Sequence, residues 1–286
     1  MTTLYQEARA ALGESVLRPK KRLGQHFLVH ESIIDAILRL LDLAPEDEIL
    51  EIGPGLGFLT RRLVEVARRV WAIEVDPALV ERMRRGPLSS HPAFDLVQGD
   101  VLKVSIDSIL PDHKVKLAAN LPYNISTPVL FRLFEFRSHF SLLVLMVQKE
   151  VADRMAAFPG TKSYGTLSVW CQIHGQILDK VSVSPEAFFP KPKVRSAILK
   201  IALYPEPLLP KQRLPVLRAL VRAAFGQRRK TLGNALGSWL KIKRGEVEAL
   251  LEREGIDPRR RGETLNVDEF IRLAHALQNT GLIADS

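Results

Sequence analysis

The chain has 286 residues, only one cysteine and no long apolar run. A single cysteine excludes an internal disulfide, and Cys171 lies in an apolar stretch where a small buried residue is the ordinary role. The longest apolar run, residues 142–147, is far shorter than the roughly 18 residues of a membrane-spanning helix. The first residues lack the basic head and apolar core of a signal peptide, so we expect a cytoplasmic protein with no membrane association.

Residues that commonly bind metals are scattered along the chain. There are seven histidines, and neither cysteines nor carboxylates cluster with them at ligand spacing, so we expect no metal site. Internal repeats and low-complexity segments are also missing. The oligomeric state cannot be read from the sequence, and a monomer is the default expectation.

Positive charge, in contrast, is in excess. The formal net charge is +9 and the isoelectric point is near 9.8. Residues 205–286 hold 15 Lys and Arg against 10 Asp and Glu, and residues 1–28 hold 5 against 2. A basic balance of this kind favours a polyanionic partner. The distribution predicts a nearly neutral middle that carries out chemistry, flanked by basic segments that bind nucleic acid.

Apolar, β-rich runs alternate with helical patterns through the first 200 residues. Apolar residues recur at helical spacing at Ile33, Ile37 and Leu41, and again at Val129 and Leu133. Such alternation predicts a Rossmann-like α/β fold: a mostly parallel sheet with helices on both faces and an antiparallel strand last. The expected strands are Glu48–Ile52, Val70–Val75, Phe94–Gln98, Val115–Ala119, Leu142–Val147, Ile177–Val183 and Ala197–Tyr204.

The pattern changes near residue 204. Prolines at positions 205, 207 and 210 break any continuing strand or helix, and only helical patterns follow. We therefore expect an α/β domain over residues 1–204, with a basic N-terminal arm, and a smaller all-helical domain over residues 205–286. The expected C-terminal helices are Leu214–Phe225, Thr231–Leu240, Glu246–Glu254 and Val267–Gln278.

Residues 47–57 read DEILEIGPGLG, a strand that runs into a glycine-rich turn before a helix. Gly53 and Gly55 let the turn close and let a ligand approach the backbone. The helix N-terminus behind them offers unpaired N–H groups. Glu74 ends the second strand 21 residues beyond Gly53, where doubly wound folds place an acid that binds a ribose. Together these residues predict a site for a nucleoside-bearing cofactor.

The third strand bears on the identity of that cofactor. It runs into Gly99 and Asp100, and an acid there accepts a hydrogen bond from an adenine amino group; the alternative is a helix-capping aspartate. Consecutive strand ends that carry Gly53, Glu74 and Asp100 predict one adenosine moiety lying across them. NAD needs a second half-site, which the sequence does not offer, whereas S-adenosylmethionine does not.

The fourth strand ends in Asn120-Leu121-Pro122-Tyr123. The N6 amino group of adenine is a poor nucleophile because its lone pair is delocalised into the ring. Acceptors for both N–H groups localise that lone pair, and the Asn120 side-chain oxygen and the Leu121 carbonyl are the candidates. Pro122 would stiffen the turn, and Tyr123 would stack on the target base, a contact worth about 1–3 kcal/mol. The alternative is a polar turn with an aromatic ring packed beneath it.

Over nearly its whole length the sequence resembles the small-subunit ribosomal RNA adenine N6,N6-dimethyltransferases. The motifs that carry the resemblance are KRLGQHFL (21–28), EIGPG (51–55), NLPYNIS (120–126), QKEVADR (148–154), FFPKPKV (188–194) and FGQRRK (225–230). The resemblance implies methylation, twice each, of two adjacent adenosines near the 3′ end of the rRNA in a pre-ribosomal small subunit. It also implies S-adenosylmethionine contacts by His26, Leu28, Gly53, Glu74, Asp100 and Asn120.

Three positions need comment within this resemblance. Relatives often have asparagine where His26 stands, and a backbone contact would be indifferent to that change. Arg195 stands where many relatives have an acid, which alters a local RNA contact but no proposed catalytic atom. Phe188 begins an F-x-P-x-P-K pattern and is expected to cover the other face of a flipped adenine. Phe189 is the second candidate for covering the adenine. The alternative for Phe188 is packing in the hydrophobic core.

Basic residues outside these motifs are candidates for rRNA binding. They are Arg218, Arg222, Arg228, Arg229 and Lys230 in and after the first C-terminal helix, and Lys20, Lys21 and Arg22 in the N-terminal arm. Arg218, Arg222 and Arg229 are expected on one helical face, away from an apolar face. Basic residues on one helical face ordinarily just face solvent. The excess of basic residues over the whole chain favours the interpretation that these residues bind RNA. Binding through phosphates should weaken steeply with salt.

Other functions remain as alternatives. The protein could act as a ribosome-assembly or transcription factor in which catalysis matters little, although an intact Asn120 motif and donor site argue against pure loss of catalysis. It could instead methylate adenine in large-subunit rRNA or in DNA; the QRRK segment and the long N-terminal arm favour the small subunit. A dehydrogenase is the most distant alternative, and failure to bind NAD would exclude it.

Overall fold

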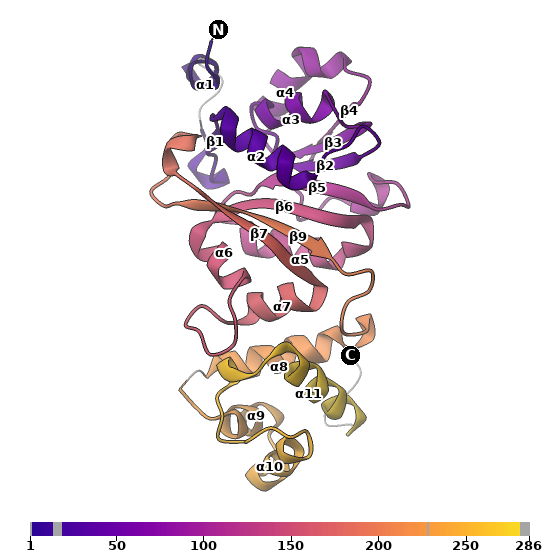
Figure 1. Ribbon diagram of the computed structural model, residues 1–286, viewed down its shortest axis with the longest axis vertical. Helices are drawn as coiled ribbons and strands as arrows, with labels where there is room; N and C mark the ends of the chain where they lie inside the picture. The colour runs from indigo at the N-terminus through magenta and orange to yellow at the C-terminus, as the bar shows by residue number, and fades with distance from the viewer. Residues whose placement is uncertain (1, 14–18, 228, 281–286) are drawn as a thin grey trace. The chain divides into compact units, whose positions relative to one another are not determined.

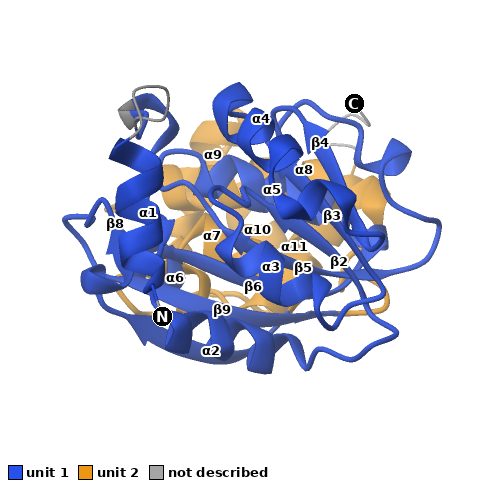
Figure 2. Cartoon of the chain, turned by 90° about the horizontal axis from the view of Figure 1, so that it is seen from above, with its two compact units in different colours: residues 1–152, 176–203 blue, residues 153–175, 204–286 orange. Residues whose placement is uncertain are grey.

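The computed structural model describes residues 2–13, 19–227 and 229–280. The chain divides into two compact units (Figures 1 and 2). Unit 1 consists of residues 1–152 and 176–203, and unit 2 of residues 153–175 and 204–286.

Seven strands form one sheet in the order β4-β3-β2-β5-β6-β9-β7 (Figure 1). The strands from β4 to β6 are parallel to their neighbours, and β9 is antiparallel to β6. This arrangement confirms the predicted mostly parallel sheet. The strands are β2 (Glu48–Ile52), β3 (Arg69–Glu74), β4 (Phe94–Gln98), β5 (Val115–Asn120), β6 (Phe140–Gln148), β7 (Gly175–Val183) and β9 (Ser196–Leu203).

Burial along the strands follows their place in the sheet. Strand β6 lies inside the sheet and is buried at six consecutive positions, residues 142–147, because helices cover a parallel sheet on both faces. The edge strand β7 is exposed or half-buried from Gln176 to Ser182, and polar side chains there discourage pairing with another chain. The apolar runs therefore mark the interior of the sheet.

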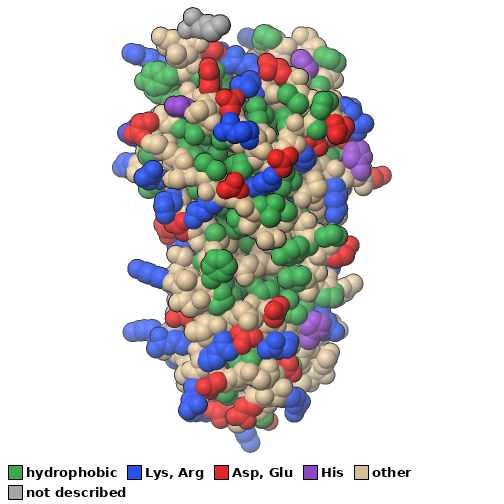
Figure 3. All heavy atoms as spheres, in the orientation of Figure 1, with side chains coloured by type: hydrophobic (Ala, Val, Ile, Leu, Met, Phe, Trp, Pro, Cys, Tyr) green, Lys and Arg blue, Asp and Glu red, His purple; other side chains and the backbone are tan. Residues whose placement is uncertain are grey.

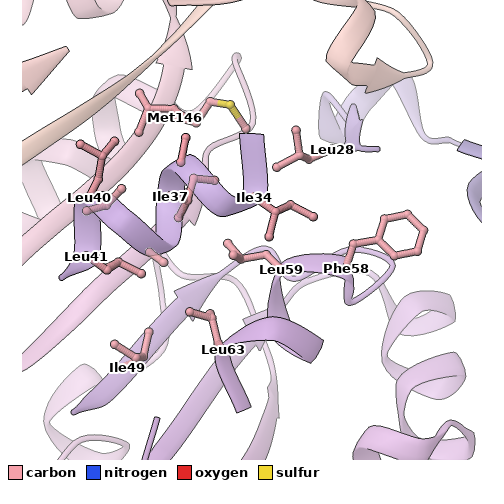
Figure 4. Packing of buried hydrophobic residues seen from close by; sticks show 14 of the residues in the cluster. Leu28, Ile34, Ile37, Leu40, Leu41, Ile49, Phe58, Leu59, Leu63 and Met146 are labelled. Carbon is pink, nitrogen blue, oxygen red and sulfur yellow. The ribbon is translucent and has the colours of Figure 1, made fainter. Parts of the chain in front are cut away.

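Helices α2 and α3 pack on one face of the sheet. Figure 4 shows Ile34 and Ile37 of α2 close to Leu59 and Leu63 of α3, and all four are buried. Apolar residues three and four positions apart give α2 the continuous stripe that this packing requires. The helices of unit 1 are α1 (Leu4–Gly13), α2 (Glu31–Leu41), α3 (Phe58–Val64), α4 (Pro77–Arg85), α5 (Ser126–Glu135) and α6 (Lys149–Met155), the last of which ends in unit 2.

A second, two-stranded sheet joins distant parts of unit 1. Strand β1 (Phe27–Leu28) pairs antiparallel with β8 (Phe188–Phe189), with Phe27 opposite Phe189 and Leu28 opposite Phe188. The pattern of the sequence did not predict these strands, because two residues are too few to show an alternation. The pairing brings the N-terminal arm to the loop that contains the FFPKPKV motif.

Unit 2 is helical. Its helices are α7 (Thr166–His174), α8 (Leu214–Gly226), α9 (Leu232–Leu240), α10 (Arg244–Arg253) and α11 (Val267–Asn279). Leu217, Leu220, Phe270 and Leu273 are fully buried in its core. Residues 153–175 belong to this unit because Val169 and Ile173 of α7 join the same core. The sequence expectation of a single boundary at residue 204 did not include this insertion, and the two domains expected from the sequence stay a prediction.

Short 3-10 helices connect the longer elements. They are η1 (Lys21–Leu23), η2 (Pro87–Ser90), η3 (Ile106–Ser108), η4 (Arg137–His139), η5 (Pro185–Ala187), η6 (Lys211–Arg213) and η7 (Gly262–Thr264). No helix in residues 2–13, 19–227 and 229–280 has both the length and the apolarity needed to cross a membrane.

Candidate active site

A cavity opens at the carboxyl ends of the parallel strands of unit 1. This is where open α/β sheets bind their ligands, because the strand ends and helix N-termini converge there. The structure brings together, in its lining, nearly all of the predicted cofactor and catalytic residues. These are His26, Leu28, Gly53, Gly55, Glu74, Asp100, Asn120, Leu121, Pro122 and Tyr123.

The glycine-rich loop adopts a backbone that favours glycine. Gly53, Gly55 and Gly57 have φ angles of 71°, 61° and 79°, a left-handed conformation that costs other residues steric strain. A Cβ atom on Gly55 would also lie 2.9 Å from the Phe27 ring. At Gly53 the nearest atom to an added Cβ is the Asn120 carbonyl oxygen at 3.9 Å. No side chain of these glycines therefore covers the loop backbone where it borders the cavity.

Glu74 is fixed at the end of β3 by backbone donors. The Gly55 N–H donates to Glu74 Oε2 over 3.1 Å, and the Asp76 N–H donates to Oε1 over 2.9 Å. Burial raises the pKa of Glu74 from its ordinary value, and these hydrogen bonds oppose the rise. A carboxylate fixed in this way, next to glycine backbone that carries no side chain, is a suitable acceptor for the hydroxyl groups of a ribose.

Asp100 closes a turn after β4 and lines the cavity. Its side-chain Oδ1 accepts a hydrogen bond from the Leu102 N–H over 2.9 Å, and no helix begins at this residue, so it does not cap a helix. It lies in the cavity lining next to Gly99 and Val101. The turn fixes the carboxylate in place, and its contact with an adenine amino group stays a prediction.

Glu51 was missed as a site residue by the sequence analysis. It lines the cavity, is almost fully buried, and accepts a hydrogen bond from the Thr60 hydroxyl over 2.6 Å. Burial raises its pKa to about 8; the Thr60 bond opposes this rise, and the nearby Glu74 charge adds to it. A glutamate between Leu50 and Ile52, in the apolar part of the strand EILEI, was the available signal, since an acid there has no reason to be buried for packing alone.

Asn120 is oriented by the N-terminal arm. Its side-chain N–H donates to the His26 backbone carbonyl over 2.9 Å. Because the amide nitrogen is used in this way, the side-chain oxygen is left as the acceptor on a residue that lines the cavity. The backbone carbonyl of His26 thus contacts Asn120, and the backbone contact of His26 with the cofactor stays a prediction.

Tyr123 is held on two sides. The His26 ring stacks on it with centroids 5.3 Å apart and planes 28° apart, and its hydroxyl makes a 2.6 Å hydrogen bond with the Ser196 hydroxyl. Burial raises the pKa of Tyr123, and the bond with Ser196 opposes the rise. His26 is itself anchored, since its Nδ1–H donates to the Pro190 carbonyl over 2.6 Å. The ring of Tyr123 therefore has a defined orientation beside Asn120.

Lys20 pairs with an acid of unit 1, and its contact with RNA stays a prediction. Its ammonium group pairs with Asp76 Oδ1 at 2.5 Å, and Gln25 donates to Asp76 Oδ2 over 2.8 Å. Burial alone would raise the pKa of Asp76, but the hydrogen bonds from Lys20 and Gln25 hold it below its ordinary value. This network fastens the arm to the start of α4. Arg22 is exposed, as expected for an RNA contact, and the side chain of Lys21 lies outside the described part of the chain.

Phe188 is also placed differently from the expectation. It is 2% exposed, belongs to the core of unit 1, and does not line the cavity. Pairing of β8 with Leu28 turns its side chain into that core. Phe189 is half-buried and packs edge-on against Tyr5, with centroids 5.3 Å apart. Phe188 therefore packs in the hydrophobic core, which was the alternative to covering the target base.

The basic residues expected in unit 2 are split by the end of a helix. Arg218 and Arg222 are exposed on α8, four positions apart on one face. Helix α8 ends at Gly226, so Arg229 and Lys230 follow in an exposed turn and do not share that face. Arg228 lies outside the described residues.

Charge on the visible face is mixed. Figure 3 shows Lys and Arg side chains interspersed with Asp and Glu side chains over both units, without one continuous basic field. Among the described residues, no group of three or more His, Cys, Asp or Glu side chains is arranged to hold a metal ion. The cavity lining combines apolar side chains with the carboxyl groups of Glu51, Glu74 and Asp100 and the amide of Asn120.

Solved structures with the same architecture are methyltransferases. A dimethyladenosine transferase from Plasmodium falciparum superposes with a TM-score of 0.79 at 26% identity, covering 90% of this chain and 98% of that one. The 23S rRNA methyltransferase ErmE superposes with a TM-score of 0.65 at 28% identity, covering 88% of this chain and 99% of that one. Both cover the two units.

Sequence comparisons are more specific. The ribosomal RNA small subunit methyltransferase A of Syntrophotalea carbinolica is 46% identical over 91% of this chain and 97% of its own length. The same-named protein of Geobacter metallireducens is 43% identical over 94% of this chain and 98% of its own length. The sequence profile of the family described as ribosomal RNA adenine dimethylase matches residues 16–279. This chain therefore belongs to the ribosomal RNA adenine dimethylase family.

Proposed function

We propose that this protein transfers methyl groups from S-adenosylmethionine to N6 of two adjacent adenosines near the 3′ end of small-subunit rRNA, giving N6,N6-dimethyladenosine. The observation that carries the proposal is the juxtaposition of Asn120 and Tyr123 with Gly53 and Glu74 around one cavity. Residues suited to bind a nucleoside and an acceptor suited to an amino group thus line the same cavity. Membership of the family supplies the reaction class.

The residues of the cavity fit S-adenosylmethionine. Glu74 would bind the ribose hydroxyls and Asp100 the adenine amino group, while the bare backbone at Gly53 and Gly55 allows a close approach. Leu28 and the backbone of His26 close the same cavity from the N-terminal arm. When bound, this cofactor supplies an electrophilic methyl group on a sulfonium centre.

The chain's own contribution to the reaction is to position and polarise the target amine. The Asn120 side-chain oxygen accepts one N6–H, and the Leu121 carbonyl is the candidate for the other, which concentrates the lone pair on N6. Tyr123 stacks on the base and holds it against the cavity. No general base is required, because N6 becomes acidic once it carries the new methyl group and loses its proton to solvent. Orientation of the two reactants supplies most of the rate enhancement.

The substrate particle is a further part of the proposal. Relatives that are 43–46% identical over at least 91% of the chain carry a small-subunit name, whereas the large-subunit enzyme ErmE is 28% identical. We place the reaction on a pre-ribosomal small subunit, carried out by a cytoplasmic monomer. Arg218, Arg222, Arg229 and Lys230 are proposed to bind rRNA phosphates. A role in ribosome assembly besides catalysis is compatible with the same contacts.

The test is methyl transfer from labelled S-adenosylmethionine to under-methylated small subunits, with mass analysis of the nucleosides. The parent protein is expected to form dimethyladenosine, and Asn120→Ala is expected to form almost none while still binding the subunit. Under-methylated large subunits are the specificity control. Absence of transfer by the parent protein, with tight binding to small subunits retained, would exclude the enzymatic proposal for this substrate and leave an assembly role.

A further inference from the structure

The start of β9 places two cations beside the candidate base site. Ser196, the first residue of β9, makes the 2.6 Å hydrogen bond with the Tyr123 hydroxyl. Arg195 precedes it directly, and Lys193 lies two residues further back. The carbonyl of Arg195 accepts a hydrogen bond from the Lys149 N–H over 2.9 Å, which fixes this backbone against the end of β6. The backbone that carries Lys193 and Arg195 is therefore held next to Tyr123.

Both side chains are exposed and unpaired. Lys193 and Arg195 are exposed, and neither forms an ion pair with any residue that the structure describes. Lys191, on the same loop, is different because its ammonium group pairs with Glu186. Val194 between the two cations is 45% exposed, one of few large apolar side chains at the surface of unit 1. A cation–apolar–cation segment with no partner inside the chain is suited to an external anionic partner.

We propose that Lys193 and Arg195 form a phosphate-binding contact that holds the RNA strand on which the target adenosine lies. The proposal rests on the proposed function, because only a nucleic-acid substrate brings phosphates to within a few residues of Tyr123. A base that leaves its stack remains tied to its backbone, so the flanking phosphates must lie near the mouth of the base site. The cations fix the position of that backbone, and Tyr123 and Asn120 then act on the base.

The experiment compares the double variant K193Q/R195Q with the parent protein. The Michaelis constant for under-methylated small subunits and its salt dependence are measured, together with the dissociation constant for S-adenosylhomocysteine. We expect the Michaelis constant to rise about tenfold at low salt and the slope of its logarithm against log salt to fall by about one for each cation lost. Cofactor affinity should stay unchanged. R195E alone should give a larger rise than R195Q.

A matched control removes the same charge elsewhere. Arg39, in the last turn of α2, and Lys114, just before β5, are exposed, unpaired among the described residues, and lie toward the amino ends of the strands. K114Q/R39Q tests whether net charge alone explains the change. Equal Michaelis constants and slopes for the two double variants would overturn the proposal.

The experiment also separates failure of the proposed function from binding of the two cations to a ribosomal protein. If the parent protein transfers no methyl groups, the proposed function fails, and subunit binding at several salt concentrations still reports on the two cations. Binding of a protein-free RNA fragment that contains the adjacent adenosines separates RNA from a ribosomal protein as the partner. A salt-slope difference seen on subunits but missing on this fragment would assign the cations to a protein and overturn the proposal.

Discussion

The side-chain N–H of Asn120 donates a hydrogen bond to the backbone carbonyl of His26 across 2.9 Å. These residues are 94 positions apart and meet because β1 and β5 both border the cavity. The bond fixes which face of the Asn120 amide presents its oxygen. It also ties closure of the N-terminal arm to the geometry of the catalytic acceptor.

Replacement of Asn120 by aspartate should therefore affect both the arm and the chemistry. Aspartate keeps the size and the acceptor oxygens but has no N–H, so a carboxylate oxygen would face the His26 carbonyl. We expect the rate of methyl transfer to fall by about 10²–10³, comparable with loss of one preorganised polar group in an active site. We also expect weaker cofactor binding. Single-turnover transfer and calorimetric titration with S-adenosylhomocysteine measure the two effects.

The control for this experiment is Asn124→Asp. Asn124 lies on the same turn and donates to the Arg22 carbonyl over 3.1 Å at an exposed site. Water can replace that bond, so we expect less than a tenfold effect on the rate. A full rate for Asn120→Asp would contradict the role assigned to the amide N–H.

Tyr123 should act mainly through its ring. Tyr123→Phe removes only the bond to Ser196, for which we expect a loss of about 1 kcal/mol in transition-state stabilisation, a factor of roughly five. Tyr123→Ala removes stacking on the base and should cost about 1–3 kcal/mol more. Values of kcat/KM on under-methylated subunits measure both. Ser196→Ala should match Tyr123→Phe, and a much larger effect of Ser196→Ala would point to a role of its own.

The sheet could be predicted because its signals are local. Each of the seven long strands contains apolar, β-prone residues in a short segment, and the structure confirms all seven, with ends shifted by no more than two residues. Motif residues at strand ends, such as Gly53, Glu74 and Asn120, meet at one edge because parallel strands bring their carboxyl ends together. The binding roles of these residues stay predictions.

What could not be predicted depends on contacts between distant segments. The pairing of β1 with β8 turns Phe188 into the core, and no local pattern distinguishes a buried from a base-facing phenylalanine. The ion pair of Lys20 with Asp76 spans 56 positions, so Lys20 resembled any other surface cation in the sequence. The helical face proposed for Arg229 was wrong, because α8 ends at Gly226 and Arg229 lies beyond its end.

The Lys20–Asp76 pair should control how firmly the N-terminal arm closes. Lys20→Met keeps much of the side-chain bulk and removes the charge, so Asp76 would keep only its bonds from Gln25 and the Ala78 N–H. We expect three- to tenfold weaker binding of S-adenosylhomocysteine and faster amide hydrogen exchange at residues 23–29. A pair of this exposure contributes about 1 kcal/mol, which sets that range. Lys103→Met removes an exposed cation away from the arm and should change neither quantity.

The same pair predicts a response to acid. The folded state lowers the pKa of Asp76, so its contribution to stability is present above the ordinary carboxyl pKa and is lost as pH falls through the lowered value. Exchange at residues 23–29 should therefore accelerate, beyond the intrinsic pH effect, only in strongly acidic solution. Asp76→Asn should show the accelerated exchange already at neutral pH.

Glu51 should make the stability of the protein depend on pH in the opposite sense. Burial raises its pKa from 4.5 to about 8, so the folded state favours the protonated carboxyl. The stabilisation is complete below pH 4.5 and is lost as pH rises through about 8. Within that window each pH unit should lower the free energy of unfolding by roughly 1.4 kcal/mol. Urea denaturation followed by circular dichroism, from pH 5 to pH 8.5, measures this slope.

Glu51→Gln should remove this dependence, because the amide stays neutral and its nitrogen or oxygen can still bond with the Thr60 hydroxyl. The variant should gain stability relative to the parent as pH rises, so that the two curves diverge toward pH 8. Glu31→Gln, at an exposed position in the first turn of α2, should leave the parent's slope intact. Parallel curves for Glu51→Gln and the parent would mean that Glu51 is ionised throughout the range. Its charge would then have to be stabilised inside the cavity, which would make it a candidate ligand for the cationic end of S-adenosylmethionine.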